Sequence, residues 1–387
     1  MKKVGVKFIL ISLLLCSCSS DKEQESVKNP EPPKYIVEMK HPTKVWVQST
    51  HLKIDSFFNK YFDTSRFSGQ FLVAKNGHIV FEKNLGYANF PSKRTTNSET
   101  PIHVASVSKF VTATAVLRLV QSQKLQLDEQ VKKYLKNFPY QGITIRMLLN
   151  HRSGIPYYAY FSETIWDKNQ IMRNSDILNM LVKNKIPLNY PPDTHFSYCN
   201  TNYALLALIV EKVSGKKFPE AMNNLVFEPL GMKNSFIREI KNNHVLFQKA
   251  ALSYNSKFQL QNDDFLDGIY GDKNLYTTAV DLLQLDKALY GHVFLSQSLK
   301  NEIFKGYSYE KEGRNNYGLG IRIIEEADKS KYFFHSGWWH GNTAMFATLR
   351  SDTVTIIALS NRYSKSVFTV NRLANYFGEY PFHFKEE

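Results

Sequence analysis

The spacing of apolar residues divides the first part of the chain into one helix and two strands. Between residues 52 and 62 the apolar positions recur at helical spacing, which predicts a helix. Two strand-like runs follow at 71–75 and 78–82, and Asn76-Gly77 between them is typical of a two-residue hairpin turn. We therefore expect the ordered chain to begin with a helix and an antiparallel hairpin.

The middle of the chain follows a helical pattern. Nearly every position from 110 to 120 is apolar, which is typical of a helix enclosed by other elements. Further apolar periodicity occurs at 177–182 and at 202–213, where Ser214-Gly215 ends the pattern. Residues from about 125 to 265 are therefore expected to form a mainly helical subdomain.

The last part of the chain is rich in strand-like runs. They lie at 317–324, 332–335, 343–350 and 353–359, and their short connections favour antiparallel pairing. An amphipathic helix at 364–377 follows and should cover a sheet face. The pattern predicts a mixed α/β (α+β) fold with an antiparallel sheet.

The composition is that of a globular protein with an N-terminal targeting segment. The chain has 387 residues, of which 43% are hydrophobic and 14% aromatic, enough for a sizeable core within residues 51–387. Residues 1–18 combine lysines with an apolar run that is too short to span a bilayer. This layout is typical of a secretory signal and predicts export.

The end of this segment, Leu15-Cys16-Ser17-Cys18, resembles a bacterial lipoprotein signal, so Cys18 is the expected lipidation site. Residues 19–50 are polar, contain four prolines and are expected to be a tether between lipid and domain. The expected location is the cell envelope, with the protein anchored to a bacterial membrane on a side that stays open. Cleavage to a soluble secreted protein is the alternative.

The number of cysteines and the distribution of charge exclude a disulfide and a nucleic-acid partner. Only Cys199 remains beyond the signal, so no intrachain disulfide can form and the cysteine is expected to be a small buried residue. Removing the three lysines of the signal lowers the formal net charge from +14 to +11. The remaining lysines are scattered, without a basic helix, a zinc motif or an aromatic RNA-binding signature, so no nucleic-acid partner is expected.

The segment Ser106-Val107-Ser108-Lys109 is the best candidate for chemistry. Residues three apart on a helix have β-carbons about 5–6 Å apart, so the Lys109 amine can reach the Ser106 hydroxyl and take its proton. The same Ser-x-x-Lys pattern occurs at 19–22, 214–217 and 308–311, but only Ser106 precedes a helix of buried type. Ser106 and Lys109 are therefore predicted to be a nucleophile and its base.

Further motifs follow this pair along the chain, and their order is similar to that in a known protein family. Tyr198-Cys199-Asn200 lies between a loop and a helix, and His335-Ser336-Gly337 ends a strand, where the glycine permits close approach of a substrate. The segments 143–156 and 271–278 add longer local matches. Together these motifs resemble the serine β-lactamase and penicillin-binding protein superfamily, in the branch that contains class C β-lactamases, D-specific peptidases and esterases. The resemblance covers about residues 52–377.

The resemblance implies a β-lactamase/transpeptidase-like fold, with helices on both faces of the sheet. It implies that Ser106 is the nucleophile, that Lys109 and Tyr198 transfer protons and that Asn200 donates to the substrate amide or ester. The strand residues His335, Ser336 and Gly337 would bind substrate. The backbone N–H groups of Ser106 and Trp338 would form the oxyanion hole, in which one donor is typically worth about 2.7–4 kcal/mol.

His335 departs from the family pattern, because related β-lactamases usually have a lysine there. A histidine is largely neutral near pH 7 and would pair less well with a substrate carboxylate, which argues against efficient β-lactam turnover. No metal or other cofactor is expected. His335 and His340 are candidate metal ligands, but the sequence offers neither a His-x-x-x-His helix nor a carboxylate partner for them.

These observations predict an exported, lipid-anchored serine hydrolase that forms an acyl-enzyme at Ser106 on a small ester or peptide-like amide of the cell envelope. A D,D-carboxypeptidase or D-aminopeptidase acting on cell-wall peptides and a weak β-lactamase are alternatives within this class. A penicillin-binding or sensor-type module that reacts without turnover is the alternative from another class. The natural substrate and the oligomeric state are not specified by the sequence.

Overall fold

The computed structural model describes residues 1, 35–62, 66–240, 245–326, 330–380 and 382. The account below concerns the part of the chain from Pro33 to Glu387. The predicted signal with Cys18 and the first half of the predicted tether lie outside the described residues. Within the described part of the chain, no helix is both long and apolar enough to cross a lipid bilayer.

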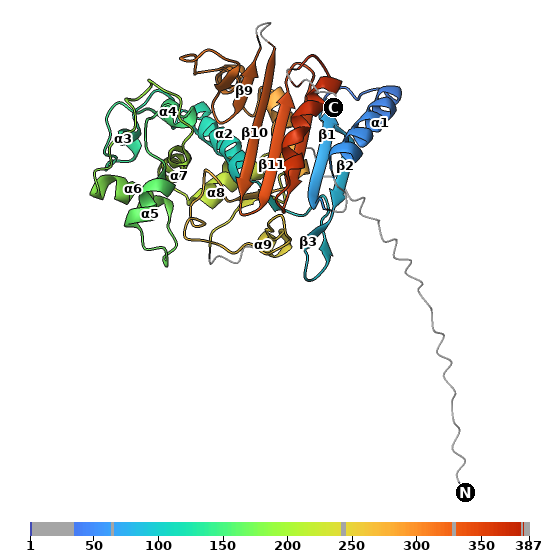
Figure 1. The fold of residues 1–387 in the computed structure, drawn as a ribbon, viewed down its shortest axis with the longest axis horizontal. Helices are drawn as coiled ribbons and strands as arrows, with labels where there is room; N and C mark the ends of the chain where they lie inside the picture. Colours follow the sequence, from blue (N-terminus) through green and yellow to red (C-terminus); the bar gives the residue numbers. More distant parts are fainter. Residues whose placement is uncertain (2–34, 63–65, 241–244, 327–329, 381, 383–387) are drawn as a thin grey trace. The chain divides into compact units, whose positions relative to one another are not determined.

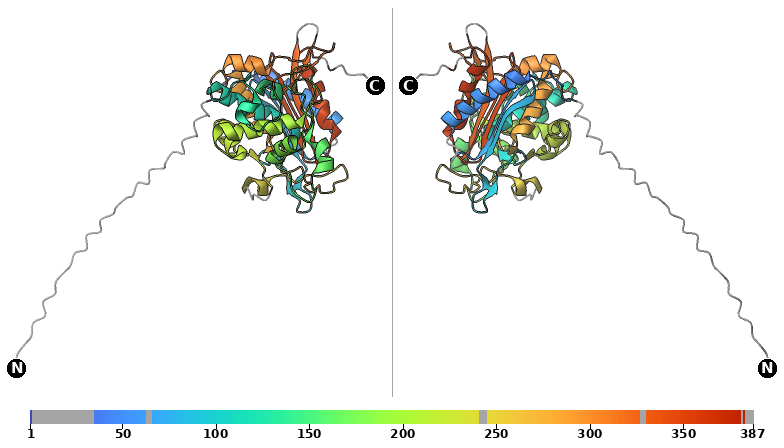
Figure 2. Two further views of the ribbon diagram at one scale, coloured as in Figure 1. Left: turned by 90° about the vertical axis from the view of Figure 1, so that its left-hand side faces the viewer. Right: turned by 90° about the vertical axis from the view of Figure 1, so that its right-hand side faces the viewer.

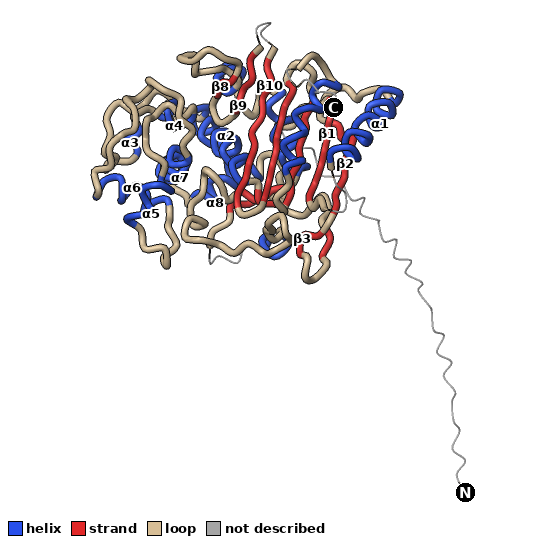
Figure 3. Tube along the Cα trace, viewed as in Figure 1, coloured by secondary structure: helices blue, strands red, loops and turns tan. Residues whose placement is uncertain are grey.

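A seven-stranded antiparallel sheet forms the centre of the fold (Figures 1 and 3). Its strand order is β2-β1-β12-β11-β10-β9-β8, so the first hairpin pairs with the last strand of the chain. The strands are β1 (Gly69–Lys75), β2 (His78–Leu85), β8 (Asn315–Tyr317), β9 (Arg322–Glu325), β10 (Lys331–Trp339), β11 (Asn342–Leu349) and β12 (Val354–Ser360).

Successive side chains of a strand point to opposite faces, and the residues of β1 therefore enter two different cores. Phe71 and Val73 pack in a core beneath α1 (Lys44–Tyr61) and the terminal 3₁₀ helix η3 (Lys365–Tyr376), which we call the α1-side core. Leu72 and Ala74 pack on the other face, in the α2-side core. Figure 2 shows α1 beside η3 on one side of the sheet. The predicted fold class, with helices on both faces, is confirmed.

The α2-side core surrounds α2 (Ser108–Gln121), whose residues are buried on nearly every side. Helix α10 (Ala279–Tyr290) packs against β1 and β12 on this face, and α11 (Gln297–Ile303) follows it along the chain. A 3₁₀ turn η1 (Ala105–Val107) precedes α2 directly and contacts β10 and β11. The central strands therefore hold the start of α2 in place.

Helices dominate the chain between residues 125 and 265, and those up to residue 183 lie to the left of α2 in Figure 1. Helix α7 contacts α2, α4 and α6 and ends at Gly215, whose φ of 70° is the left-handed conformation that ends many helices. The helical elements are α3 (Val131–Tyr134), α4 (Ile145–Leu149), α5 (Tyr158–Ile165), α6 (Asn174–Lys183), α7 (Asn200–Ser214), α8 (Phe218–Met222), the π-helical turn η2 (Asn223–Phe227) and α9 (Val245–Lys249).

Short strands were not anticipated. β5 (Ile102–His103), β7 (Leu275–Thr277) and β6 (Phe236–Ile237) form a second sheet in that order, and β5 ends shortly before Ser106. β3 (Tyr87–Asn89) and β4 (Arg94–Thr95) form a third sheet. Strands of two or three residues are too short to show the alternation from which a strand is predicted.

Some predicted boundaries are wrong. The first helix begins at Lys44 instead of near His51, because the Thr43 side chain caps it by accepting a hydrogen bond from the Trp46 backbone. The run 317–324 is two paired strands, β8 and β9, because the chain turns between them at Gly318 to Gly320. A side chain at Gly318 would collide with the Ile303 carbonyl, at 1.9 Å.

The predicted hairpin is confirmed. β1 and β2 pair antiparallel, and Asn76 and Gly77 between them have φ values of 52° and 69°. Positive φ at both central residues is the geometry of the turn that matches strand twist in two-residue hairpins.

Candidate active site

Ser106 lies where the 3₁₀ turn η1 passes into α2. It keeps partial exposure, whereas the neighbours Ala105, Val107 and Lys109 are buried. Ala105 has a φ of 47°, a left-handed conformation that a residue with a side chain adopts rarely and that is common beside reactive groups. The turn therefore presents the Ser106 hydroxyl at the start of an otherwise enclosed helix.

The predicted contact between Lys109 and Ser106 is present in the structure. Lys109 is fully buried, and its Nζ donates to Ser106 Oγ at 3.1 Å and to the backbone carbonyl of Asp272 at 2.9 Å. A lysine in this position can exchange a proton with the serine hydroxyl without moving. The Asp272 carbonyl, which the sequence did not indicate, fixes the direction of the amine.

Tyr198 joins this pair through its ring. The Lys109 Nζ lies 5.1 Å from the centre of the Tyr198 ring, and the guanidinium carbon of Arg322 lies 4.7 Å from it. Cations within about 6 Å of an aromatic ring are attracted to its face. The structure thus brings Ser106, Lys109 and Tyr198 together, and it adds Arg322, which the sequence analysis did not single out.

Asn200 is the first residue of α7 and lies near this group. Its Nδ2 donates to the hydroxyl of Tyr157 at 2.9 Å, and its Oδ1 is buried without a hydrogen-bond partner among the described residues. Burial raises the pKa of Tyr157, which keeps that hydroxyl protonated. The Asn200 amide is therefore oriented by a tyrosine that no sequence motif indicated.

His335, on β10, is fully buried instead of open to a ligand. Its Nδ1 lies 2.9 Å from the Ser336 carbonyl and its Nε2 lies 3.0 Å from the Tyr317 hydroxyl. Because a carbonyl only accepts, Nδ1 carries the proton and Nε2 accepts from Tyr317. Burial, together with the charges of Arg322 and Lys109, lowers the pKa of His335 well below its usual value, so the ring is neutral at pH 7.

Gly337 allows β10 to approach η1 closely. A Cβ atom at this position would lie 2.3 Å from the Val104 carbonyl and 3.1 Å from the Ser106 nitrogen. The backbone after Gly337 therefore runs beside the Ser106 N–H, whereas the Trp338 side chain is 63% exposed. This approach brings the β10 backbone beside the Ser106 N–H, where the family resemblance implies an oxyanion hole.

A buried polar network that the sequence analysis missed supports Lys109. Tyr158 donates to the Asp272 carboxylate at 2.7 Å, and the Lys273 Nζ donates to the Tyr158 hydroxyl at 2.9 Å. Burial lowers the pKa of Lys273, although the charge of Asp272 opposes this shift. The adjacent charged residues Asp272 and Lys273 were the only sign of this network in the sequence. Their partner Tyr158 is distant in sequence, so the network itself could not be predicted.

His340, in contrast, has the carboxylate partners that the sequence analysis failed to find. Its Nε2 lies 2.8 Å from Asp267 Oδ2 and 3.7 Å from Asp264 Oδ2, and the Trp339 indole also donates to Asp267. Burial opposes the charged ring, but the Asp267 hydrogen bond and the nearby carboxylates outweigh it and raise the pKa of His340. His340 therefore forms an ion pair at the turn between β10 and β11, apart from His335.

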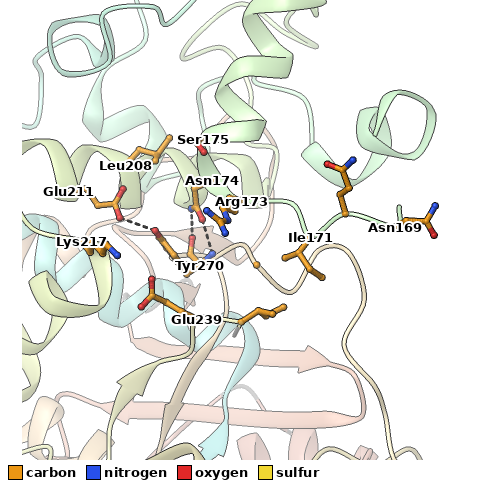
Figure 4. A pocket seen from close by; sticks show the side chains of 13 residues that line it. Asn169, Ile171, Arg173, Asn174, Ser175, Leu208, Glu211, Lys217, Glu239 and Tyr270 are labelled. Carbon is orange, nitrogen blue, oxygen red and sulfur yellow. Dashed lines mark hydrogen bonds between the residues drawn. The ribbon is translucent and has the colours of Figure 1, made fainter. Parts of the chain in front are cut away.

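A cavity of about 710 Å³ lies elsewhere, between α6, α7 and the loop at Tyr270 (Figure 4). Tyr270 donates to Glu211 at 2.8 Å, and the Asn174 side chain bonds the Tyr270 backbone. None of the predicted site residues lines this cavity. This cavity is therefore separate from the predicted active site, because the predicted nucleophile and its base meet at Ser106.

The fold and the residues around Ser106 define a serine hydrolase, and the chain belongs to the beta-lactamase family, whose profile matches residues 54–377. The predicted superfamily is therefore confirmed. Penicillin-binding protein 4* of Bacillus subtilis (strain 168) is 30% identical over 327 residues, which cover 81% of this chain and 72% of that protein.

Solved structures agree with this assignment. The penicillin binding protein from Bacillus halodurans superposes with a TM-score of 0.72 at 27% identity, covering 84% of this chain and 99% of that chain. EstCE1, a hydrolase with promiscuous acyltransferase activity, shares the fold with a TM-score of 0.66 at 20% identity, covering 82% of this chain and 94% of that chain.

Proposed function

We propose that this protein hydrolyses a small ester or peptide-like amide through an acyl-enzyme at Ser106. The observation that carries the proposal is the 3.1 Å contact between Lys109 Nζ and Ser106 Oγ, with the Tyr198 ring on the same amine. A serine hydroxyl is a weak nucleophile until a neighbouring group takes its proton, and this arrangement supplies such a group.

In the acylation step, the single proton of Ser106 passes to the pair formed by Lys109 and Tyr198, which hold it between them, while Oγ attacks the substrate carbonyl carbon. The carbonyl oxygen becomes negative and is stabilised by the backbone N–H groups of Ser106 and Trp338. Asn200 orients the acyl group. The bond to the leaving group then breaks, and Tyr198 returns the proton to the departing oxygen or nitrogen.

In the deacylation step, water takes the place of the leaving group. One proton of the water passes to the Tyr198 and Lys109 pair, which later returns it to Ser106, while the water oxygen attacks the acyl carbon. The same oxyanion hole stabilises the second intermediate, and its collapse releases the acid while Ser106 recovers its proton. The enzyme therefore ends the cycle unchanged.

The neutral His335 bears on the alternatives. Because its ring carries no charge, His335 cannot pair with the carboxylate of a penicillin as a lysine does, which argues against efficient β-lactam turnover. A D,D-carboxypeptidase or D-aminopeptidase acting on cell-wall peptides remains within the proposal. A sensor that is acylated without release of product differs from it only in the second step.

Intact-protein mass spectrometry tests the proposal. The protein is incubated separately with p-nitrophenyl acetate, a D-alanyl-D-alanine peptide and a penicillin, and adduct mass and product release are followed over time. We expect a transient adduct with at least one ester or amide and continuous release of product. The Ser106→Ala variant should form no adduct and lose at least about 10³-fold in kcat/KM.

The matched control is Ser214→Ala, which removes the hydroxyl of another Ser-x-x-Lys pattern, at the end of α7. This variant should react like the wild type. Adduct formation that survives in Ser106→Ala would overturn the assignment of the nucleophile. A stable adduct without product would favour the sensor function.

We also propose that the protein is exported and anchored through lipid on Cys18, with the polar segment before α1 as a tether. The relation to penicillin-binding proteins supports a location in the cell envelope. The full chain expressed in a bacterium should fractionate with membranes, and Cys18→Ser should release it. Equal membrane association of both proteins would refute the lipid anchor.

A further inference from the structure

Asp264, Asp267 and His340 bring three atoms that can bind a metal together, outside the catalytic group. The two aspartates belong to the loop before β7, and His340 lies in the turn between β10 and β11. One side-chain nitrogen or oxygen of each residue lies within 4.8 Å of the other two. The His340 Nε2 is 2.8 Å from Asp267 Oδ2 and 3.7 Å from Asp264 Oδ2. Among the described residues, no other group of three histidines, cysteines or carboxylates is this close.

The separations of these atoms suit one ion. Zinc lies about 2.0–2.2 Å from an imidazole nitrogen or a carboxylate oxygen, so two ligand atoms of one ion are at most about 4.4 Å apart. Both contacts of His340 are shorter than this limit. The Asp264 side chain is 42% exposed and can turn towards the ion. Binding therefore needs at most a small rotation of one aspartate.

Neighbouring groups already orient the two carboxylates. The Trp339 indole N–H donates to Asp267 Oδ1 at 2.6 Å, and the Leu266 backbone N–H donates to Asp264 Oδ1 at 2.7 Å. In each carboxylate the other oxygen, Oδ2, is the one near His340. Asp267 Oδ2 also accepts from the Asp264 backbone N–H, which leaves one lone pair for an ion. Metal ligands in proteins are commonly held by such hydrogen bonds.

A cavity of about 250 Å³ beside the cluster contains polar atoms without partners. Asp267 and His340 line it together with His103 and Asn342. His103 is 2% exposed and Asn342 is 1% exposed, and within the described chain His103 Nδ1 and Asn342 Oδ1 have no hydrogen-bond partner. The Asn274 backbone N–H donates to His103 Nε2, so Nδ1 carries the proton. Because unpartnered buried polar atoms are unfavourable, the cavity is suited to a polar occupant, such as water on an ion.

The ligands and their charges favour a transition metal over calcium or magnesium. Calcium and magnesium prefer oxygen ligands, whereas zinc binds imidazole nitrogen as well as carboxylate oxygen. Asp264 and Asp267 carry two negative charges, and a protonated His340 supplies one positive charge. Arg238, which also lines the cavity, is already paired with Asp263 at 2.6 Å. A divalent cation balances both carboxylates and replaces the proton on His340 Nε2.

We propose that Asp264, Asp267 and His340 bind a divalent transition metal ion of the zinc type, with water completing its coordination. The ion fastens the turn after β10 to the loop before β7 and thereby stabilises the folded protein. It lies outside the reacting group, so this inference does not depend on the proposed function. Without metal, Asp267 and His340 keep their ion pair, and chelator-treated protein is therefore the reference state for measurements of stability.

Calorimetry with zinc chloride tests the proposal. The purified full-length protein is treated with EDTA, dialysed and titrated at about pH 7.5, where a histidine can give up its proton to the metal. We expect about one zinc ion per chain, with a Kd below about 10 µM. A hundredfold excess of zinc over this Kd should raise the melting temperature by at least about 3 °C, because the ion binds the folded state. Calcium chloride at the same concentration should have no such effect.

Asp264→Asn and Asp263→Asn form a matched pair, because each removes one carboxylate from the same loop. Asparagine at position 264 can still accept from the Leu266 N–H, so the variant should fold, which circular dichroism checks. Asp264→Asn should weaken zinc binding at least about tenfold and lose the rise in melting temperature. Asp263→Asn should bind zinc like the wild type, since Asp263 pairs with Arg238. His340→Gln removes the nitrogen ligand and should also lose binding.

Several results would overturn the metal site. They are a wild type that takes up no zinc, equal zinc binding in the wild type and Asp264→Asn, and an equal loss in Asp263→Asn and Asp264→Asn. A response to calcium as large as that to zinc contradicts the choice of metal. Failure of zinc to bind leaves acylation of Ser106 untouched, so the two proposals are refuted by different measurements.

Discussion

At the scale of single residues, burial and neighbours shift the pKa values of two histidines of the same strand and turn in opposite directions. His335 is fully enclosed beside two cations and is neutral, whereas His340 meets Asp267 and Asp264, and its pKa is raised. The sequence from His335 to Gly341 does not distinguish these environments, because the carboxylates come from the loop before β7. Charge states in this site therefore follow from the fold.

The ion pair of His340 predicts a pH dependence of stability. A histidine whose pKa is raised on folding stabilises the folded protein below its unfolded pKa of about 6.5, and this contribution is lost as the pH rises through the raised value. The wild type should therefore melt above His340→Gln near pH 6, and the difference should shrink towards pH 9.

Thermal unfolding of both proteins across this pH range measures the effect. Comparing the two proteins removes the contributions of the buried histidines His335 and His151, whose lowered pKa values act in the opposite direction. A difference in melting temperature that does not change with pH would contradict the ion pair.

Single residues also show which parts of the site could be predicted. Ser106 and Lys109 lie one helical turn apart, so local spacing alone placed the amine at the hydroxyl. Arg322, Tyr158 and Asp272 reach the same place from three separate segments, and no local pattern links them. The positions of these three residues in the site therefore depend on tertiary contacts, which the sequence pattern does not predict.

At the scale of elements, long and regular segments were predicted and short or interrupted ones were not. The hairpin at Asn76-Gly77 and helix α2 follow from turn chemistry and an unbroken apolar run. The division of 317–324 into β8 and β9 follows from the turn at Gly318 to Gly320, where the Leu319 N–H donates to the Ile303 carbonyl, a contact that is visible only after folding. The predicted ends of helices and strands are wrong where a residue distant in sequence determines them.

The close approach of β10 to η1 predicts the effect of a single methyl group. Gly337→Ala would place a Cβ 2.3 Å from the Val104 carbonyl and push β10 away from the Ser106 nitrogen. Because this separates the two proposed oxyanion donors, kcat/KM should fall by about 10²–10³-fold. Steady-state kinetics measures the loss, and circular dichroism checks that the variant folds.

Gly142→Ala serves as the control for this prediction. Gly142 also has a positive φ, of 73°, but no atom lies within 4 Å of an added Cβ. This variant should lose some stability through backbone strain and keep its kcat/KM. Equal kinetics for the wild type and Gly337→Ala would show that the approach of β10 is unimportant for catalysis.

At the scale of the whole molecule, the sheet separates two cores with different roles. The α2-side core holds the residues around Ser106, and the α1-side core lies beneath α1 and η3. In the α1-side core, Phe58 stacks on Phe62 with ring centres 4.7 Å apart and contacts Phe71. Stability and catalysis should therefore respond separately to mutations on the two faces.

Phe58→Ala tests this separation. Removing a fully buried ring typically costs about 3–5 kcal/mol, and no Phe58 contact reaches Ser106. The free energy of unfolding in urea should fall by about this amount, whereas kcat/KM well below the melting temperature should stay within about twofold. Leu52→Ala, on the exposed face of the same helix, should change neither quantity appreciably.

The pairing of β1 with β12 has a consequence for how the protein is made. Ser360 donates to the Ser68 carbonyl, 292 residues away, so these two neighbouring strands of the sheet come from opposite ends of the chain. Contacts this distant form slowly. During synthesis β1 must wait for its partner until almost the entire polypeptide has left the ribosome, and the nascent enzyme should remain inactive and open to proteases until its last strand arrives.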